Sequence, residues 1–364
     1  MILCSNPSEQ FKSYQSEIEE AAIAVMRSNC YVLGKEVDHL EREFADYIGT
    51  TSAIGVANGT DAIELSLRAL NIGIGDEVIT VSHTAVATVA AIECTGAKAV
   101  LVDIEPKSFT LNPIQLEECL TKRTKAIIAV HLYGHAADLD SILTFCHSHK
   151  VFLIEDASQA HGAKYKGKRL GSFGDFGCFS CYPTKNLGAI GDAGLITTNS
   201  IDLANKIRML REYGWENRTS IYPGRNSRLD ELQATILRIK LKYLDLDNQK
   251  RRNLAKFYYD NLSSLPIILP LIHSNVESVF HLFVIQVENR HSLLNFLKQE
   301  GIIVGIPYPL AIHQHPAYKG RILTAKDMSI TESLVQSIIS LPMYPELSNS
   351  DANKIVSVLK RFYN

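Results

Sequence analysis

Between residues 53 and 198 the chain alternates short apolar, β-branched runs with amphipathic segments of helical length. The runs predict strands over residues 53–57, 78–81, 99–103, 126–130, 151–154, 176–180 and 194–198. The segments between them predict helices over residues 61–70, 84–95, 113–120 and 139–149. Because runs that are apolar throughout are typical of strands buried on both faces, we expect an α/β fold with a mostly parallel sheet covered by helices.

The second half of the chain has a different pattern. A long helical segment spans about residues 229–262, and Pro266 and Pro270 follow it. After the prolines, the pattern predicts one strand and two helices, over residues 280–287, 292–300 and 351–362. A length of 364 residues is typical of two domains. We therefore expect a large domain over residues 1–245 and a smaller α+β domain over residues 246–364.

The composition argues against several classes of function. Lys and Arg number 37 and Asp and Glu number 39, whereas a non-specific nucleic-acid binder has a basic excess. The most apolar stretch, residues 85–102, contains Glu93 and Lys98, so we expect no membrane span. The seven cysteines are odd in number and scattered, which favours reduced thiols in a cytoplasmic protein. We expect no nucleic-acid or membrane partner.

A first candidate site is the Asn-Gly-Thr-Asp segment over residues 58–61, which joins a predicted strand to a predicted helix. Gly59 permits a close approach of the backbone to a ligand, and Thr60 has a hydroxyl group to donate. Free amides at a helix N-terminus attract phosphate. Taken alone, the segment fits an ordinary turn with an N-cap better than a phosphate site, because Asn-Gly is a common turn sequence.

A second candidate is the segment over residues 155–162, which follows the predicted strand at 151–154. Asp156 lies just past the carboxyl end of that strand, where open α/β sheets bind ligands. Its carboxylate is able to pair with a cation or a protonated ring nitrogen, and His161 has the chemistry of a base or a cofactor contact. A helix N-cap followed by a packed histidine explains the segment equally well.

The third candidate is Lys185, in the segment Tyr-Pro-Thr-Lys-Asn over residues 182–186, which follows the predicted strand at 176–180. An amine on a structured, glycine-containing loop with hydroxyl groups beside it is able to form a Schiff base. The alternative is a surface lysine, which for any single lysine is the more common interpretation.

Potential metal ligands have unsuitable spacing. His147 and His149, like His313 and His315, are two residues apart rather than the four of a helical zinc site. The CxxC at residues 178–181 has no second pair to complete a zinc site. We expect no metal and interpret the CxxC as structural, with one cysteine directed into the core and the other elsewhere.

In this order and spacing, the three candidates resemble the motifs of the DegT/DnrJ/EryC1/StrS family of pyridoxal phosphate (PLP)-dependent nucleotide-sugar aminotransferases. Further resemblance covers nearly the whole chain, at residues 31–34, 40–44, 171–175, 179–194, 224–234 and 308–313. It implies the aspartate-aminotransferase type of fold (PLP fold type I): a large α/β domain with a mixed, mostly parallel sheet and a smaller C-terminal α+β domain.

The resemblance also implies the residues that hold the cofactor. Lys185 forms the Schiff base with PLP, Asp156 pairs with the pyridine nitrogen, and Gln159 lies near the ring hydroxyl. His83 occupies the position whose ring usually stacks on the cofactor. The phosphate is held by three small or hydroxyl-bearing residues: Gly59, Thr60 and Ser180. A carboxylate beside a pyridine nitrogen favours the protonated ring, which is the better electron sink.

Partners follow from the same resemblance. Asn226 reaches the phosphate in the neighbouring subunit, which implies a homodimer with shared active sites. Tyr182, Tyr308 and His313 are the implied substrate-side residues. The implied substrates are L-glutamate as the amino donor and a nucleotide-linked keto sugar as the acceptor.

The loop over residues 186–194 resembles that of the members that aminate C3 of the sugar. The implied acceptor is a dTDP-linked 3-keto-6-deoxyhexose, and the product is a dTDP-3-amino-3,6-dideoxyhexose for lipopolysaccharide O-antigen, another polysaccharide or an antibiotic sugar. The alternatives are a C4 aminotransferase, a PLP-dependent sugar dehydratase and a non-catalytic PLP-fold regulator. Lys185 argues against the dehydratase, because the dehydrating members carry histidine there. Lys185 and Asp156 together argue against the regulator.

Overall fold

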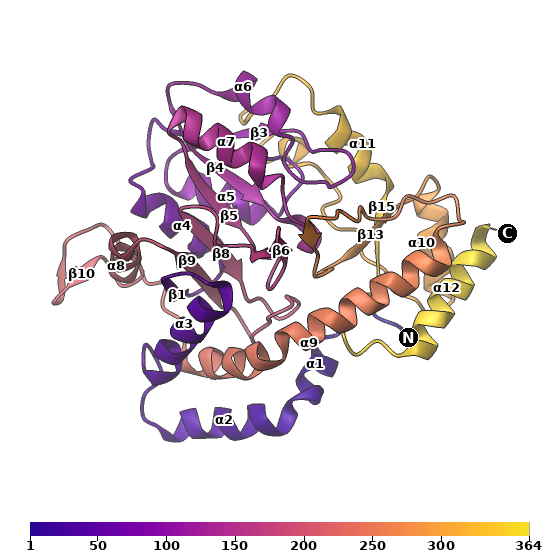
Figure 1. Ribbon diagram of the computed structural model, residues 1–364, viewed down its shortest axis with the longest axis horizontal. Helices are drawn as coiled ribbons and strands as arrows, with labels where there is room; N and C mark the ends of the chain where they lie inside the picture. The colour runs from indigo at the N-terminus through magenta and orange to yellow at the C-terminus, as the bar shows by residue number, and fades with distance from the viewer. Residues whose placement is uncertain (364) are drawn as a thin grey trace.

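The computed structural model describes residues 1–363, and an eight-stranded mixed sheet lies at its centre (Figure 1). In spatial order its strands are β1 (Ser52–Val56), β9 (Gly194–Thr198), β8 (Phe176–Ser180), β5 (Phe152–Asp156), β4 (Thr124–Val130), β2 (Glu77–Val81), β3 (Lys98–Val102) and β14 (Leu323–Thr324). β9 is antiparallel to both of its neighbours, and the remaining pairs are parallel. The predicted mixed, mostly parallel sheet is confirmed.

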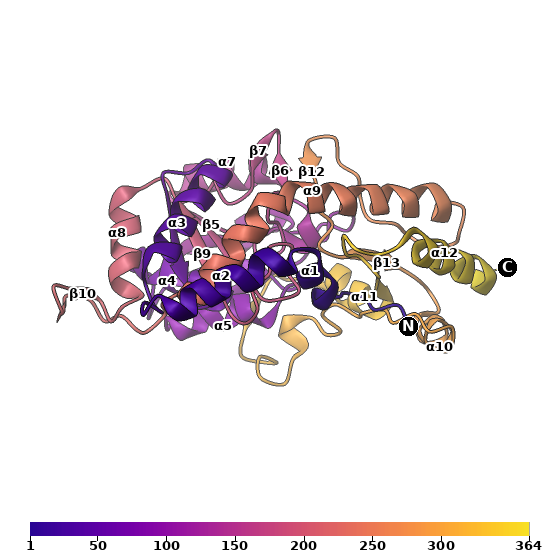
Figure 2. The same cartoon turned by 90° about the horizontal axis from the view of Figure 1, so that it is seen from below.

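Helices cover both faces of this sheet. α7 (Leu139–His149) and α5 (Val86–Cys94) lie on opposite sides of it (Figures 1 and 2). The other helices up to residue 262 are α1 (Pro7–Ser13), α2 (Gln15–Arg27), α3 (Lys35–Ile48), α4 (Gly59–Ala69), α6 (Leu116–Cys119), α8 (Ile201–Leu210) and α9 (Glu231–Leu262). α3 shows why they form where they do, since it buries Val37, Leu40 and Phe44 as a single apolar stripe.

α9 connects two hydrophobic cores. Its first half contributes Leu237 and Leu244 to the core around the sheet, and its second half contributes Ala255 to a second core. Figure 1 shows the helix running from the sheet toward the C-terminal elements. On this basis we propose a large domain over residues 1–245 and a small domain over residues 246–364.

The second core is built from elements near the C-terminus. β13 (Phe283–Gln286) pairs antiparallel with β15 (Ile338–Leu341), and α10 (Arg290–Gln299) and α12 (Asn349–Tyr363) contribute to the same core. Before α11 (Ser329–Ser337), the chain returns to the central sheet, where β14 forms the edge strand and Ile312, Tyr318 and Met328 join the larger core. This return places residues 308–313 next to the large domain.

Some elements have no clear signal in the sequence. β14 has two residues, and so do the strands of two small sheets, β10 (Trp215–Glu216) with β11 (Thr219–Ser220), and β12 (Val276–Glu277) with β6 (Lys164–Tyr165) and β7 (Lys168–Arg169). Strands this short do not contain one full period of alternation. Within residues 1–363, no helix is long and apolar enough to cross a membrane.

The CxxC differs from the expectation. Cys178 and Cys181 are both completely buried and both are free thiols, so the prediction that only one faces the core was wrong. β8 ends at Ser180, and the alternation of a strand does not extend to the residue beyond its end.

Candidate active site

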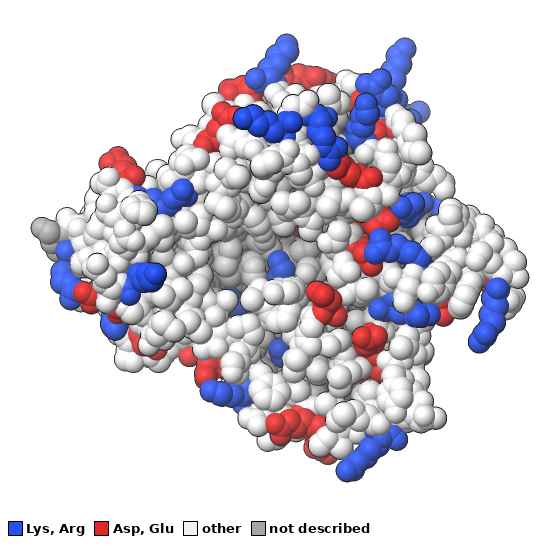
Figure 3. All heavy atoms as spheres, turned by 180° about the vertical axis from the view of Figure 1, so that it is seen from behind, with Lys and Arg blue, Asp and Glu red and all other residues white. Residues whose placement is uncertain are grey.

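A cavity of about 540 Å³ opens at the carboxyl ends of the central strands. β5 ends at Asp156 and β8, its neighbour in the sheet, ends at Ser180, so the sheet itself brings the second and third candidate segments together. Residues singled out from the sequence that line the cavity are Gly59, Thr60, Asp156, Gln159, Ser180, Tyr182 and Lys185. Seen from behind, the molecule is hollowed near its centre, and cationic side-chain atoms lie inside the hollow (Figure 3).

The N-terminus of α4 forms one wall of the cavity. Asn58 caps the helix by accepting a hydrogen bond from the Asp61 amide at 2.8 Å, whereas the amides of Gly59 and Thr60 are in the first turn, where no intrahelical acceptor exists. A Cβ on Gly59 would lie 2.5 Å from Cβ of Ser180, so a side chain here would collide with the facing strand. The backbone therefore presents free amides beside the Ser180 hydroxyl, as an anion site requires.

Asp156 is 5% exposed and is held in one orientation. Its Oδ2 accepts a hydrogen bond from the Thr88 hydroxyl at 2.9 Å, and its Oδ1 accepts one from the Ser158 amide at 3.2 Å. The Thr88 hydroxyl lies 3.1 Å from that of Thr84, one turn earlier in the chain. A carboxylate has about four acceptor positions, so two hydrogen bonds leave lone pairs free at the cavity that Asp156 lines.

Lys185 lies in the loop after β8 and extends into the cavity. Burial lowers the pKa of Lys185 to about 8, although the negative charge of Asp156 acts in the opposite direction. A lysine amine that is easily deprotonated is a better nucleophile at neutral pH than a lysine in water. The structure therefore gives Lys185 the environment of a Schiff-base lysine rather than that of a surface lysine.

Distant elements hold the loop that carries Lys185. Asn186 donates to Asn248 Oδ1 at 2.8 Å and to the carbonyl of Val279 at 3.1 Å. Lys240 of α9 donates to the carbonyl of Gly188 at 2.7 Å. These contacts fix the loop backbone on both sides of the lysine, which restricts where its amine reaches.

Gln159 belongs to a buried polar cluster beside Asp156. Its Oε1 accepts from the Tyr133 amide at 2.8 Å, and its Nε2 donates to the Tyr308 hydroxyl at 2.5 Å. His83 is completely buried and its Nε2 lies 2.7 Å from the Tyr133 hydroxyl, while its Nδ1 has no partner within residues 1–363. Burial lowers the pKa of His83 to about 3, so the ring is neutral.

The remaining predicted residues lie around the cavity. The rings of His83 and Tyr308 lie close to each other, but neither residue lines the cavity. Thr84, Ala85 and Ala87, which follow His83 in the chain, form part of the lining. His313 is held away from it, with Nδ1 2.7 Å from the Ser82 hydroxyl and Nε2 3.0 Å from the Glu332 carboxylate.

Asn226 is exposed and does not line the cavity of its own chain. The adjacent Arg225 is anchored to the first turns of α4, 2.8 Å from Asp61 and within hydrogen-bonding distance of Glu64. Asn226 therefore lies on a segment that is held near the N-terminus of α4, and the residue itself is exposed.

Three neighbours of the site carry no obvious signal in the sequence. Thr88 contacts Asp156 across 68 residues, and Tyr133 adopts a left-handed backbone with φ of 58° where its amide meets Gln159. Asp192, in the loop after Lys185, also lines the cavity. Thr84 and Thr88, four residues apart with only apolar residues between them, form the one pattern that hints at a buried contact.

These residues fit PLP. The backbone at Gly59, which a Cβ would obstruct, suits the phosphate. The buried Asp156 carboxylate suits a protonated ring nitrogen, and the Lys185 amine suits the aldehyde. Fold and site together define a PLP-dependent aminotransferase.

The comparisons with known proteins agree. The model of the DegT/DnrJ/EryC1/StrS aminotransferase family matches residues 12–360, and the chain belongs to this family of PLP-dependent sugar aminotransferases. It is 44% identical over 350 residues, 96% of each chain, to the dTDP-3-amino-3,6-dideoxy-alpha-D-galactopyranose transaminase of Aneurinibacillus thermoaerophilus. It is 40% identical over 352 residues to the UDP-N-acetyl-3-dehydro-alpha-D-glucosamine 3-aminotransferase of Acidithiobacillus ferrooxidans, covering 96% of this chain and 95% of the other.

Among solved structures, the crystal structure of DesV of S. venezuelae superposes with a TM-score of 0.97 at 39% identity, covering 100% of this chain and 98% of DesV. The fold, the cofactor and the enzyme class expected from the sequence are therefore confirmed.

Proposed function

We propose that this enzyme transfers the amino group of L-glutamate to the C3 keto group of a dTDP-linked 3-keto-6-deoxyhexose. The proposal rests on the loop after Lys185, which resembles that of the C3-aminating members and whose residue Asp192 lines the same cavity as Lys185. Both relatives described above are named for a 3-amino or 3-keto sugar, one carried by dTDP and the other by UDP. The product is a dTDP-3-amino-3,6-dideoxyhexose for O-antigen, another polysaccharide or an antibiotic.

The residues of this chain divide the work of the reaction. When bound, PLP supplies an electron sink for the carbanion that forms at the reacting carbon. Lys185 would hold the aldehyde of PLP, and its amine, which burial makes easier to deprotonate, would accept and return a proton at the reacting carbon. Asp156, oriented by Thr88 and by the Ser158 amide, would keep the ring nitrogen protonated.

Binding and orientation fall to the surrounding groups. The amides of Gly59 and Thr60, with the Ser180 hydroxyl, would hold the phosphate. Gln159 would lie near the ring hydroxyl, and His83 would stack on the ring, as the resemblance implies.

The substrate-side residues in this proposal are Tyr182, Tyr308 and His313. Tyr182 is 53% exposed at the mouth of the cavity, where it is free to cover a sugar. A productive complex needs the keto carbon roughly 3–3.5 Å from the amine, so a sugar turned by one ring position would not react.

A direct assay tests the position of the new amine. The holoenzyme is given L-glutamate with either a dTDP-linked 3-keto-6-deoxyhexose or its 4-keto isomer, and the product is identified by NMR. We expect an amine at C3. An amine only at C4 would identify a C4 aminotransferase, and loss of water from the sugar without 2-oxoglutarate formation would identify a dehydratase.

We propose further that the enzyme is a homodimer in which Asn226 of each subunit reaches the phosphate of the other site. The exposure of Asn226 on a segment fixed near α4 supports this arrangement. Mixing Lys185→Ala chains with Asn226→Ala chains should restore part of the activity, since one site of each mixed dimer carries neither defect. A fully active monomer by light scattering would contradict the proposal.

A further inference from the structure

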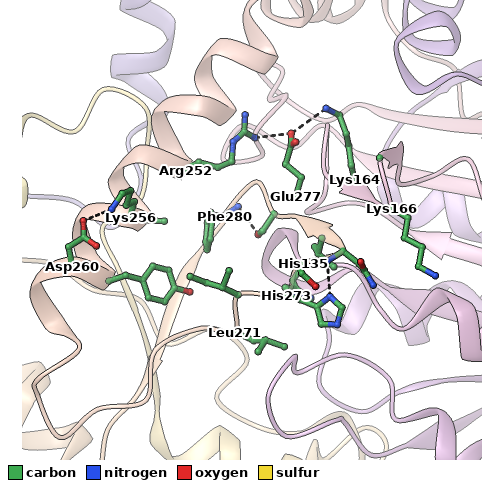
Figure 4. A pocket seen from close by; sticks show the side chains of 18 residues that line it. His135, Lys164, Lys166, Arg252, Lys256, Asp260, Leu271, His273, Glu277 and Phe280 are labelled. Atoms are coloured by element: carbon green, nitrogen blue, oxygen red, sulfur yellow. Dashed lines mark hydrogen bonds and ion pairs between the residues drawn. The ribbon is translucent and has the colours of Figure 1, made fainter.

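A second cavity, of about 790 Å³, lies between α9 and the small sheet of β6, β7 and β12. We call it the outer cavity. Its walls are the hairpin residues 164–167, the second half of α9 (252–260) and the segment 271–280, with His135 at its inner end (Figure 4). It is separate from the active site: β6, β7 and β12 lie along one edge of the molecule and α5, which lines the active site, toward the other (Figure 2).

One part of the outer cavity has more positive than negative charge. Lys164 and Arg252 approach it from opposite walls, with Glu277 between them (Figure 4). Both nitrogens lie near the same oxygen of Glu277, at 3.3 and 3.5 Å, which is longer than a charge-assisted hydrogen bond. Two cations thus share one carboxylate loosely, and one positive charge remains available to a ligand.

Two further cations at the cavity have exposed partners. Lys166 pairs with Asp140 at 2.5 Å, with exposures of 51% and 57%, and Lys256 pairs with Asp260 at 2.7 Å, with exposures of 74% and 57%. Ion pairs this exposed contribute little to stability, so an anionic ligand is able to replace either carboxylate at small cost.

The inner surface of the cavity is apolar and contains one unused acceptor. Tyr259, Leu271 and Phe280 provide a surface on which a flat ring can rest. His135 Nδ1 donates to the carbonyl of Ala136 at 2.8 Å, which leaves Nε2 as an acceptor. That Nε2 is buried without a partner among the described residues.

We propose that the outer cavity binds a nucleoside diphosphate group, either free or linked to a sugar. The diphosphate lies between Lys164 and Arg252, and the base rests on the apolar surface. An inorganic anion would leave the apolar surface unused, and an apolar ligand would leave the cations unused. The choice of thymidine as the nucleoside to test rests on the proposed function.

The segment 278–281 connects this cavity to the active site. Ser278 and Phe280 line the outer cavity, whereas the carbonyl of Val279 accepts a hydrogen bond from Asn186, next to Lys185. His281 Nδ1 lies 3.1 Å from Oδ1 of the same asparagine. The segment therefore links the outer cavity to the backbone that positions the catalytic lysine.

Hydrogen exchange on the holoenzyme tests the proposal, with dTDP and a dTDP-hexose as separate probes and inorganic pyrophosphate as a third. We expect both nucleotides to slow exchange in peptides covering residues 164–167 and 271–278, and pyrophosphate to have a weaker effect. In the double variant Lys164→Gln/Arg252→Gln this protection should need at least tenfold more nucleotide, while protection of residues 180–192 in the active site remains. Glu277→Gln should shift the protection to lower nucleotide concentration.

Lys122→Gln, at an exposed lysine that lines neither cavity, is the matched control and should behave as wild type. If dTDP slows exchange only at residues 180–192, or if the double variant keeps full protection at 271–278, the outer cavity is not a nucleotide site. The readout needs no turnover, so its outcome is independent of the position at which the sugar is aminated.

Discussion

The two cavities differ in volume, and they differ more in how exposed their charged groups are. The outer cavity is the larger, at about 790 against 540 Å³, yet its Lys166 and Lys256 are exposed and pair with exposed carboxylates. The active-site cavity is smaller, but it encloses Lys185 with a lowered pKa and a buried Asp156 held by two donors. Chemistry requires charges that water and counter-ions do not neutralise, so the enclosed groups mark the catalytic site and the exposed ones a binding site.

The strongest test of this contrast is Lys185→Ala. Removing the amine takes away both the attachment of PLP and the group that moves the proton, so transamination should fall by at least about 10⁴-fold. Release of 2-oxoglutarate from L-glutamate measures it, and Lys122→Ala is the control for loss of a lysine at the surface. Near-normal activity in Lys185→Ala would remove the lysine from the mechanism.

Asp156→Asn should have the second largest effect. The change keeps the volume but removes the charge that favours a protonated ring nitrogen, so we expect kcat to fall by about 10²-fold, or roughly 3 kcal/mol of transition-state stabilisation. PLP should still bind through Lys185 and the amides of α4, which absorbance of the purified variant will show. Wild-type kcat would mean that another group protonates the ring.

The resemblance singled out these two residues, and their places in the predicted fold agree with it: Asp156 ends β5, and Lys185 lies in the loop after β8. The runs 151–154 and 176–180 predict strands that the structure confirms as β5 and β8, apart from shifts of one or two residues in β5. In a parallel sheet, adjacent strands end at the same edge, so Asp156 and Lys185 had to lie near each other once β5 and β8 were neighbours.

The supporting contacts could not be predicted in the same way. Thr88 contacts Asp156, which is 68 residues away in the chain, and Lys240 contacts the carbonyl of Gly188, which is 52 residues away. Each contact depends on how whole helices pack. The position of His83 behind the cavity wall depends on the direction of the turn between β2 and α5, which no periodicity encodes. Its role at the cofactor stays a prediction.

The pH dependence of PLP binding should distinguish Lys185, with its lowered pKa, from an exposed lysine. The amine ordinarily titrates near 10.5, and burial brings its pKa to about 8, so the neutral form is populated well below the ordinary pKa. Binding of PLP to the apoenzyme, followed by absorbance in a stopped-flow instrument, should slow about fifteenfold from pH 8 to pH 6.5 because the neutral fraction falls by that factor. A rate that still rises steeply above pH 9 would indicate an unperturbed lysine.

Thr88 offers a smaller test of how the enclosed carboxylate is held. Thr88→Val keeps the shape but removes the donor to Asp156 Oδ2, so we expect about a tenfold loss in kcat, which corresponds to about 1.4 kcal/mol, with little change in KM. The pKa at which the PLP absorbance of the resting enzyme changes should shift as well. Thr88→Ser, which keeps the hydroxyl, should restore both properties; a spectrum of Thr88→Val identical to wild type would make the contact merely structural.

The smallest expected effect belongs to the outer cavity, where the Lys256–Asp260 pair lies four residues apart on α9. With exposures of 74% and 57%, water screens both charges, so the coupling between them in a double-mutant cycle of Lys256→Ala and Asp260→Ala should be below about 0.5 kcal/mol in the free energy of unfolding. Urea denaturation of the four proteins measures it. A coupling above about 1.5 kcal/mol would mean that Asp260 firmly neutralises Lys256, and the outer cavity would then have fewer charges to offer an anion. A weak coupling leaves the ammonium free to exchange its partner, which is the property that separates this cavity from the one around Lys185.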